Sequence, residues 1–99
     1  MSLPVVIVHG RRKILGYQQI TDLDDAVSLS PGSAILALIQ AETKTVRWRD
    51  DGVAPDVNTG MLLTVNAVME YDGDLGAIQF IETDASAKLN ITYYGPEQV

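Results

Sequence analysis

The side chains that could support catalysis in this 99-residue chain are one histidine and thirteen acidic residues, and there is no cysteine. A serine or cysteine nucleophile activated by histidine would depend on His9 alone. His9 stands beside Gly10 at an expected turn, and no serine occupies a Gly-x-Ser-x-Gly elbow. Without cysteine there is also no thiolate nucleophile, no thiolate metal site and no disulfide. The sequence therefore predicts that the protein is not an enzyme.

The aspartates gather in three groups whose oxygens could bind a hard cation. These groups are Asp22/Asp24/Asp25, Asp50/Asp51/Asp56 and Asp72/Asp74. None has the glycine and glutamate spacing of an EF-hand loop, and aspartates in turns hydrogen-bond their own backbone without an ion. A carboxylate pair for glycoside hydrolysis would have to be held about 5 to 10 Å apart in a cleft, for which a small domain has little room. We therefore expect no bound metal and no cofactor.

Four aromatic residues could stack on sugar rings: Trp48, Tyr71, Tyr93 and Tyr94. Alternation with polar neighbours places Trp48 and Tyr93 in the core and leaves Tyr94 on the exposed face. A small carbohydrate-binding module that uses Tyr94, Tyr71 or Trp48 as a stacking platform is therefore an alternative function.

Arg47 and Arg49 alternate with Val46 and Trp48 in a strand. Because successive strand side chains point to opposite faces, Val46 and Trp48 face the core and the arginines face solvent. There the arginines could pair with acidic residues across the strands, at about 0.2 to 1 kcal/mol each. They could instead reach a neighbouring subunit, since arginine is enriched at interfaces. Both interpretations are open at this point.

The charge balance argues against nucleic acid and membrane partners. Seven basic and thirteen acidic side chains give a net charge of −6, which repels phosphate backbones and anionic lipids. The one basic cluster, Arg11-Arg12-Lys13, is typical of a solvated hairpin tip. No apolar run approaches the roughly 18 to 20 residues that cross a bilayer, and the N-terminus does not read as a signal peptide.

Short β-branched or alternating stretches separated by turn residues predict an antiparallel β-protein. We expect strands at residues 5–8, 13–15, 34–42, 46–49, 61–65, 68–71, 77–82 and 87–94. The run 34–42 is apolar on both faces, and its context favours a central strand over a helix. Between Tyr17 and Leu29 strand or loop is favoured over a helical turn capped by Thr21 or Asp22.

Three glycines are expected to end strands or reverse the chain. Gly16 is expected to end the second strand, and Gly95-Pro96 the last one. Asp72-Gly73 is typical of a hairpin turn, because primed turns need positive φ.

These elements predict a single all-β domain over residues 1–99. We expect a jelly-roll-like antiparallel β-sandwich of seven or eight short strands with little or no helix, in which residues 1–17 form an N-terminal arm or hairpin. The expected core anchors are Trp48, Phe80, Leu89 and Ile91. The expected interface residues are Arg47, Arg49, Tyr94, Val6 and Val8, because an apolar N-terminal strand can be donated to the sheet edge of a neighbour.

Residues 26–94 resemble small uncharacterised proteins encoded in tailed bacteriophages and prophages near virion structural genes. The residues that carry this resemblance lie in segments 34–42, 46–55, 59–63, 74–82 and 87–94, and include Arg-Trp-Arg-Asp-Asp-Gly at 47–52. Residues 5–17 lie outside it. The resemblance brings no assigned active site. It implies a non-enzymatic β-sandwich that attaches to a capsid or tail protein, forms homo-oligomers, and is found in the virion or in the host cytoplasm before assembly.

Overall fold

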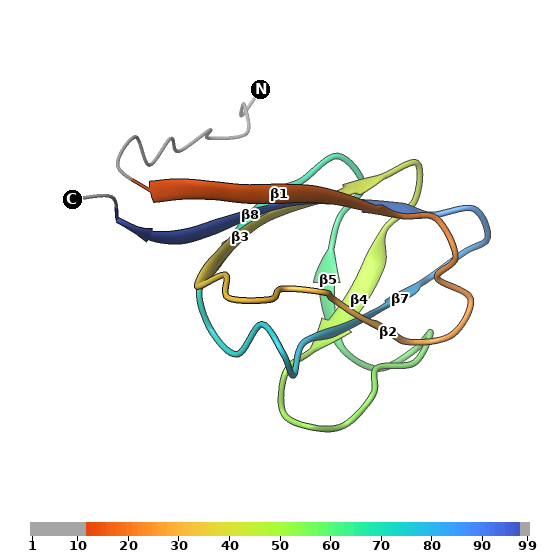
Figure 1. The fold of residues 1–99 in the computed structure, drawn as a ribbon. Coiled ribbons are helices and arrows are strands. Elements are labelled where there is room, and N and C mark those ends of the chain that lie inside the picture. The colour runs from red at the N-terminus through yellow and green to blue at the C-terminus, as the bar shows by residue number, and fades with distance from the viewer. Residues whose placement is uncertain (1–11, 98–99) are drawn as a thin grey trace.

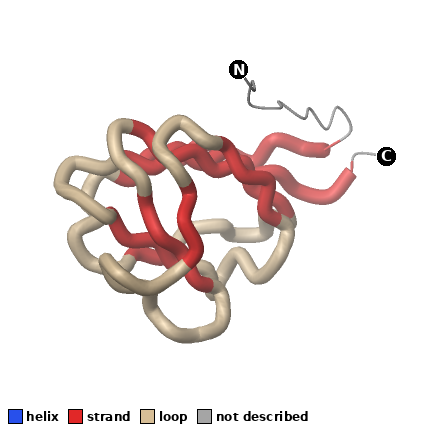
Figure 2. The backbone as a smooth tube through the Cα atoms, turned by 180° about the vertical axis from the view of Figure 1, so that it is seen from behind, coloured by secondary structure: helices blue, strands red, loops and turns tan. Residues whose placement is uncertain are grey.

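The computed structural model describes residues 12–97, which form eight β-strands and no helix (Figure 1). The strands are β1 (Arg12–Ile20), β2 (Val27–Ser28), β3 (Leu36–Glu42), β4 (Val46–Arg49), β5 (Met61–Leu63), β6 (Val68–Tyr71), β7 (Gln79–Glu82) and β8 (Lys88–Glu97). Figure 2 shows these strands from behind, joined by loops. A membrane-spanning helix is accordingly not found in this part of the chain.

The strands form two four-stranded antiparallel sheets, in the orders β1-β8-β3-β6 and β2-β7-β4-β5. The first strand pairs with the last, the second with the second to last, and so on toward the β4–β5 connection. The hydrogen-bonded pairs are β1 with β8, β2 with β7, β3 with β6 and β4 with β5. This pairing of mirror partners across two sheets is the jelly-roll order. The predicted all-β sandwich is therefore confirmed.

The core lies between the two sheets and is built by alternate residues of each strand. On β8, Leu89, Ile91 and Tyr93 are buried, whereas Asn90 and Thr92 face outward and are partly exposed. The buried side chains of the core are Leu23, Leu29, Ala37, Ile39, Ala41, Val46, Leu63, Tyr71, Leu75, Ile78, Phe80, Ala87, Leu89, Ile91 and Tyr93. The ambiguous apolar run 34–42 forms the interior strand β3, as its context predicted.

The outer face of the first sheet carries a hydrogen-bonded row of polar side chains. The Tyr17 hydroxyl and the Gln19 amide donate to Asn90 Oδ1, at 2.6 and 2.9 Å. Asn90 Nδ2 in turn donates to Glu42 Oε1 at 2.9 Å. The row ties β1, β8 and β3 together on the face that points away from the core.

Two predicted strand ends are wrong, and both errors involve bulges. β1 continues through Gly16, whose φ of +153° suits glycine at a register shift. β8 continues through Gly95 and Pro96, which lie opposite one residue of β1 in a second register shift. Proline is tolerated at such a bulge because a ladder hydrogen bond is already missing there. The predicted strand at 5–8, with Val6 and Val8, lies outside the described residues, as does His9.

The predicted hairpin at Asp72-Gly73 is also wrong. The flanking strands β6 and β7 belong to different sheets, so residues 72–78 cross from one sheet to the other. Gly73 is not among the residues with positive φ. The glycine must therefore serve another purpose than a primed turn.

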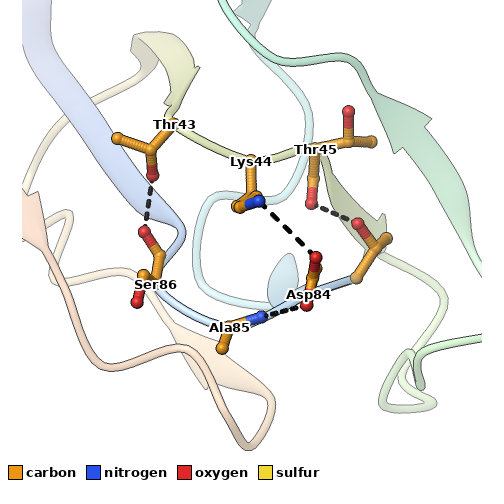
Figure 3. Close-up of polar contacts among 7 residues, drawn as sticks. Thr43, Lys44, Thr45, Asp84, Ala85 and Ser86 are labelled. Carbon is orange, nitrogen blue, oxygen red and sulfur yellow. Dashed lines mark hydrogen bonds and ion pairs between the residues drawn. The ribbon is translucent and has the colours of Figure 1, made fainter.

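At one end of the sandwich, polar contacts join the β3–β4 and β7–β8 connections (Figure 3). The Thr43 hydroxyl donates to the Ser86 carbonyl at 2.5 Å, and both residues have positive φ, near +70°. Lys44 Nζ lies 3.5 Å from Asp84 Oδ2. The pKa of Asp84 is lowered by the Ala85 amide and, next, by Lys44. These contacts fix two turns that non-glycine residues adopt only at a cost in backbone energy.

Candidate functional site

A pocket of about 440 Å³ lies where β4 ends and the β4–β5 loop returns to β5. It is lined by Trp48, Arg49, Asp50, Asp51, Thr59, Gly60 and Met61. Its size falls in the range of about 300 to 1,000 Å³ that is typical of small-molecule sites. The pocket joins an aromatic ring and a thioether to charged and hydroxyl groups within one short stretch of chain.

The position of Trp48 follows from its strand. Val46, two residues earlier on the same face, is fully buried, and Trp48 packs against the core at the end of β4. It stays partly exposed, and Met61 opposite it on the edge strand β5 is 60% exposed. Trp48 thus lies at the rim of the core, whereas the sequence placed it among the core anchors.

Tyr71 supports Trp48 from behind. Its ring lies edge-on to the indole, with the centroids 6.1 Å apart and an interplanar angle of 65°. The Tyr71 hydroxyl donates to Asp50 Oδ2 at 2.7 Å. Burial, followed by this hydrogen bond and the Asp50 charge, raises the pKa of Tyr71 to about 12. The phenol therefore stays neutral, and the stability that it contributes is lost only as the pH rises from about 10 through about 12.

Arg49 and Asp51 form a bidentate ion pair beside the pocket. Arg49 Nε donates to Asp51 Oδ1 at 3.0 Å, and Nη2 donates to Oδ2 at 2.5 Å. The hydrogen bonds from Arg49 are the main reason why the pKa of Asp51 falls to about 2. The carboxylate is therefore ionised throughout the physiological range.

Replacing Arg49 with glutamine is expected to return the pKa of Asp51 from about 2 toward its ordinary 3.8. Glutamine offers neither the positive charge nor the two-pronged donor geometry that stabilises the carboxylate. Because the pKa of Asp51 is lower in the folded protein than its ordinary 3.8, the ionised carboxylate stabilises the fold above pH 3.8. This stability is lost as the pH falls through about 2. An NMR titration of the Asp51 carboxyl carbon measures the shift. Asp84, which pairs with Lys44, serves as the internal control and should titrate unchanged.

Arg47 lies on the face of β4 opposite to Trp48 and holds the β4–β5 loop in place. Its Nε donates to the Val57 carbonyl at 3.1 Å, and its Nη1 donates to the Gly60 carbonyl at 2.9 Å. Gly60 has φ +141°, and a Cβ there would lie 3.1 Å from the Trp48 carbonyl oxygen and 3.2 Å from the Cβ of buried Pro55. Arg47 thus contacts two backbone carbonyls and Arg49 contacts Asp51, two residues further along the chain, instead of acidic residues across the strands. The interface role of both arginines stays a prediction.

The other predicted site residues lie apart from the pocket. Phe80, Leu89 and Ile91 are 0% exposed and lie in the core. Tyr94 lies on the outer face of β8, opposite Ile14 and Leu36, and is partly exposed. Tyr93 points inward and donates to Gln18 Oε1 at 2.5 Å. The structure therefore does not bring Tyr94 and Trp48 into one stacking platform.

Two aspartates of the acidic groups bind backbone amides in turns. Asp56 Oδ1 accepts from the Asn58 amide at 2.8 Å, and Asp74 Oδ1 accepts from the Gly76 amide at 3.1 Å. The pKa of Asp22 is raised, chiefly by its hydrogen bond with Asp24. Over residues 12–97 no group of three or more histidine, cysteine or acidic residues is placed to hold a metal ion.

No protein-family model, no curated protein and no solved structure matches this chain. The functional argument therefore depends on the pocket, on the edge strands and on the sequence. Sequence reasoning missed Thr59 and Met61 as pocket residues. The only signal that could have found them was the loop of residues 50–60, whose glycine and proline bring residue 59 back beside Trp48.

Proposed function

We propose that the protein is a non-enzymatic virion structural or decoration protein of a phage or prophage. It acts through self-association and through contacts with a capsid or tail protein. The observation that carries the proposal is the exposure of large apolar side chains on two edge strands. Ile14 and Tyr17 on β1 are 69% and 63% exposed, and Leu62 on β5 is 57% exposed.

Edge strands favour association because their outer backbone amides and carbonyls are unpaired within the sheet. Among the strands of residues 12–97, β1 is nine residues long and forms one edge of its sheet, and β5 forms an edge of the other sheet. Natural proteins normally protect such edges with charges or proline. Rotational symmetry between copies would cover the apolar side chains at both edges. The jelly roll itself is used in viral capsid domains and in lectins, so the fold agrees with the proposal without deciding it.

Replacing Ile14 or Leu62 with glutamate is expected to weaken self-association at least tenfold. A buried, unpaired carboxylate at an interface opposes assembly strongly, whereas the same change on a free surface has little effect. Sedimentation velocity over a range of concentrations measures the association constant. Val53→Glu is the matched control, because Val53 is 53% exposed in the β4–β5 loop and not on a strand edge.

A wild-type protein that remains a monomer at every concentration would contradict self-association. Mass spectrometry of purified particles from the encoding strain tests the virion location separately. Particles that contain the protein at many copies support the structural role, and particles that lack it overturn that role.

A further inference from the structure

The Trp48 pocket has the composition of a site for an uncharged polyhydroxyl ligand. We propose that it binds a neutral saccharide, a function additional to self-association at the strand edges. The partly exposed indole of Trp48 and the side chain of Met61 form the apolar part of the lining. The C–H face of a pyranose ring is the part of a sugar that packs on such an aromatic surface.

The polar part of the lining offers both acceptors and donors. Asp50 accepts the Tyr71 hydroxyl through Oδ2, and residues 12–97 place no donor on its Oδ1. Arg49 carries N–H donors at the same pocket, and the Thr59 hydroxyl, which hydrogen-bonds the Asp56 carboxylate, adds an oxygen that can accept. A sugar hydroxyl is a donor and an acceptor at once, so this mixture suits it better than a ligand that only donates or only accepts.

The groups around the pocket are held in place before a ligand arrives. The Arg49–Asp51 pair fixes both side chains, and Tyr71 fixes Asp50 and the indole. On the far side of β4, Arg47 holds the loop that supplies Thr59. Preorganisation of this kind lowers the entropy that binding must overcome.

Charge narrows the ligand class. Asp50 and Asp51 outnumber Arg49 in the lining, and the whole chain carries −6. Phosphorylated, sulfated and sialylated ligands are therefore disfavoured. A compact cation would meet the Arg49 guanidinium in the same wall. A neutral saccharide is repelled neither by the aspartates, as an anion would be, nor by Arg49, as a cation would be.

Tryptophan fluorescence measures binding at this pocket directly, because Trp48 is the only tryptophan in the sequence. A fluorescence titration with lactose, cellobiose and N,N′-diacetylchitobiose should give a saturable change with at least one of the three. The dissociation constant is expected on the order of 1 mM, since the pocket is open at the surface. Amide NMR shifts at Thr59 and Met61 provide a second readout. Choline and inorganic phosphate serve as the cationic and anionic probes.

Met61→Glu is expected to weaken saccharide binding at least tenfold, because it places a charge in the apolar wall. Leu62→Glu is the matched control: Leu62 is 57% exposed, close to the 60% of Met61, but points to the opposite face of β5. Leu62→Glu should bind saccharide normally while losing self-association, so the two proposals can fail independently. The saccharide site is overturned if neither readout changes with any of the three sugars. It is likewise overturned if choline or phosphate alone binds, or if both variants weaken binding equally.

Discussion

Replacing Phe80 with alanine is expected to lower the free energy of unfolding by about 3 to 5 kcal/mol. Phe80 is 0% exposed and heads the fully buried side chains of the core by volume. It lies on β7 between Val27 of β2 and Trp48 of β4, so its ring anchors three strands of one sheet. The loss combines the transfer energy of the ring with the energy of the cavity that remains.

For a domain of this size the total stability is about 5 to 15 kcal/mol, so the variant should lose at least about a fifth of it. The melting temperature should fall by at least about 12 °C, which thermal denaturation followed by circular dichroism measures. Gln79→Ala is the control, since Gln79 is the adjacent, partly exposed residue on the other face of β7. That change should stay within about 0.5 kcal/mol of wild type. A Phe80→Ala protein as stable as Gln79→Ala would show that the core is not packed around this ring.

The sequence predicted those elements whose structure depends on alternation. On β8 the period-two pattern of Leu89, Ile91 and Tyr93 specifies which face is buried, and the two sheets confirm it. The apolar run of β3 was ambiguous by itself, and the surrounding strands resolved it correctly. Because burial requires an apolar side chain at each inward-facing position of such a strand, one irregular position does not hide the alternating pattern.

The strand ends were predicted less well, because glycine and proline were interpreted as breaks. Gly16 and Pro96 instead lie at bulges, where pairing continues on either side of the irregularity. A bulge depends on the partner strand, and the partner is not visible in local sequence. The same holds for Asp72-Gly73, where the local turn preference is outweighed by the crossing of the chain between sheets.

The candidate site was predicted only in part. Trp48 and the arginines were singled out from the strand, but their surroundings come from the loop of residues 50–60. Arg47 hydrogen-bonds two backbone carbonyls. Every residue has a backbone carbonyl, so the residue types do not show which ones the arginine contacts. Tyr71, which supports Trp48, comes from the other sheet, more than twenty residues away. Such contacts become apparent only when the sheets are stacked.

Gly73 illustrates how a correct residue can be singled out for a wrong reason. Its backbone does not need positive φ, and yet a side chain has no room there. A Cβ at this position would lie 2.5 Å from the Tyr71 hydroxyl oxygen and 2.6 Å from its Cζ. The constraint is therefore the close approach of the loop to the tyrosine that supports the Trp48 pocket.

Gly73→Ala is accordingly expected to destabilise the protein by about 2 to 4 kcal/mol. Overpacking in a filled site costs about 1 to 3 kcal/mol, and losing a hydrogen bond to a charged group about 1.5 to 3 kcal/mol, with partial relaxation expected. Displacing Tyr71 breaks its hydrogen bond to Asp50 and its edge-on contact with Trp48. The tryptophan emission should therefore change, and the pKa of Tyr71 should fall from about 12. Denaturant unfolding and a spectrophotometric pH titration measure these effects.

Gly76→Ala in the same loop is the control, because a Cβ there meets only Asp74 Oδ1, at an ordinary 3.5 Å. It should be tolerated, as its backbone φ is not positive either. If the requirement at residue 73 were a turn conformation, Gly73→Asn would restore stability, since asparagine tolerates positive φ. If the requirement is space, Gly73→Asn must be at least as destabilising as Gly73→Ala. Rescue by asparagine would thus contradict the account in which Gly73 makes room for Tyr71 and, through it, for the pocket at Trp48.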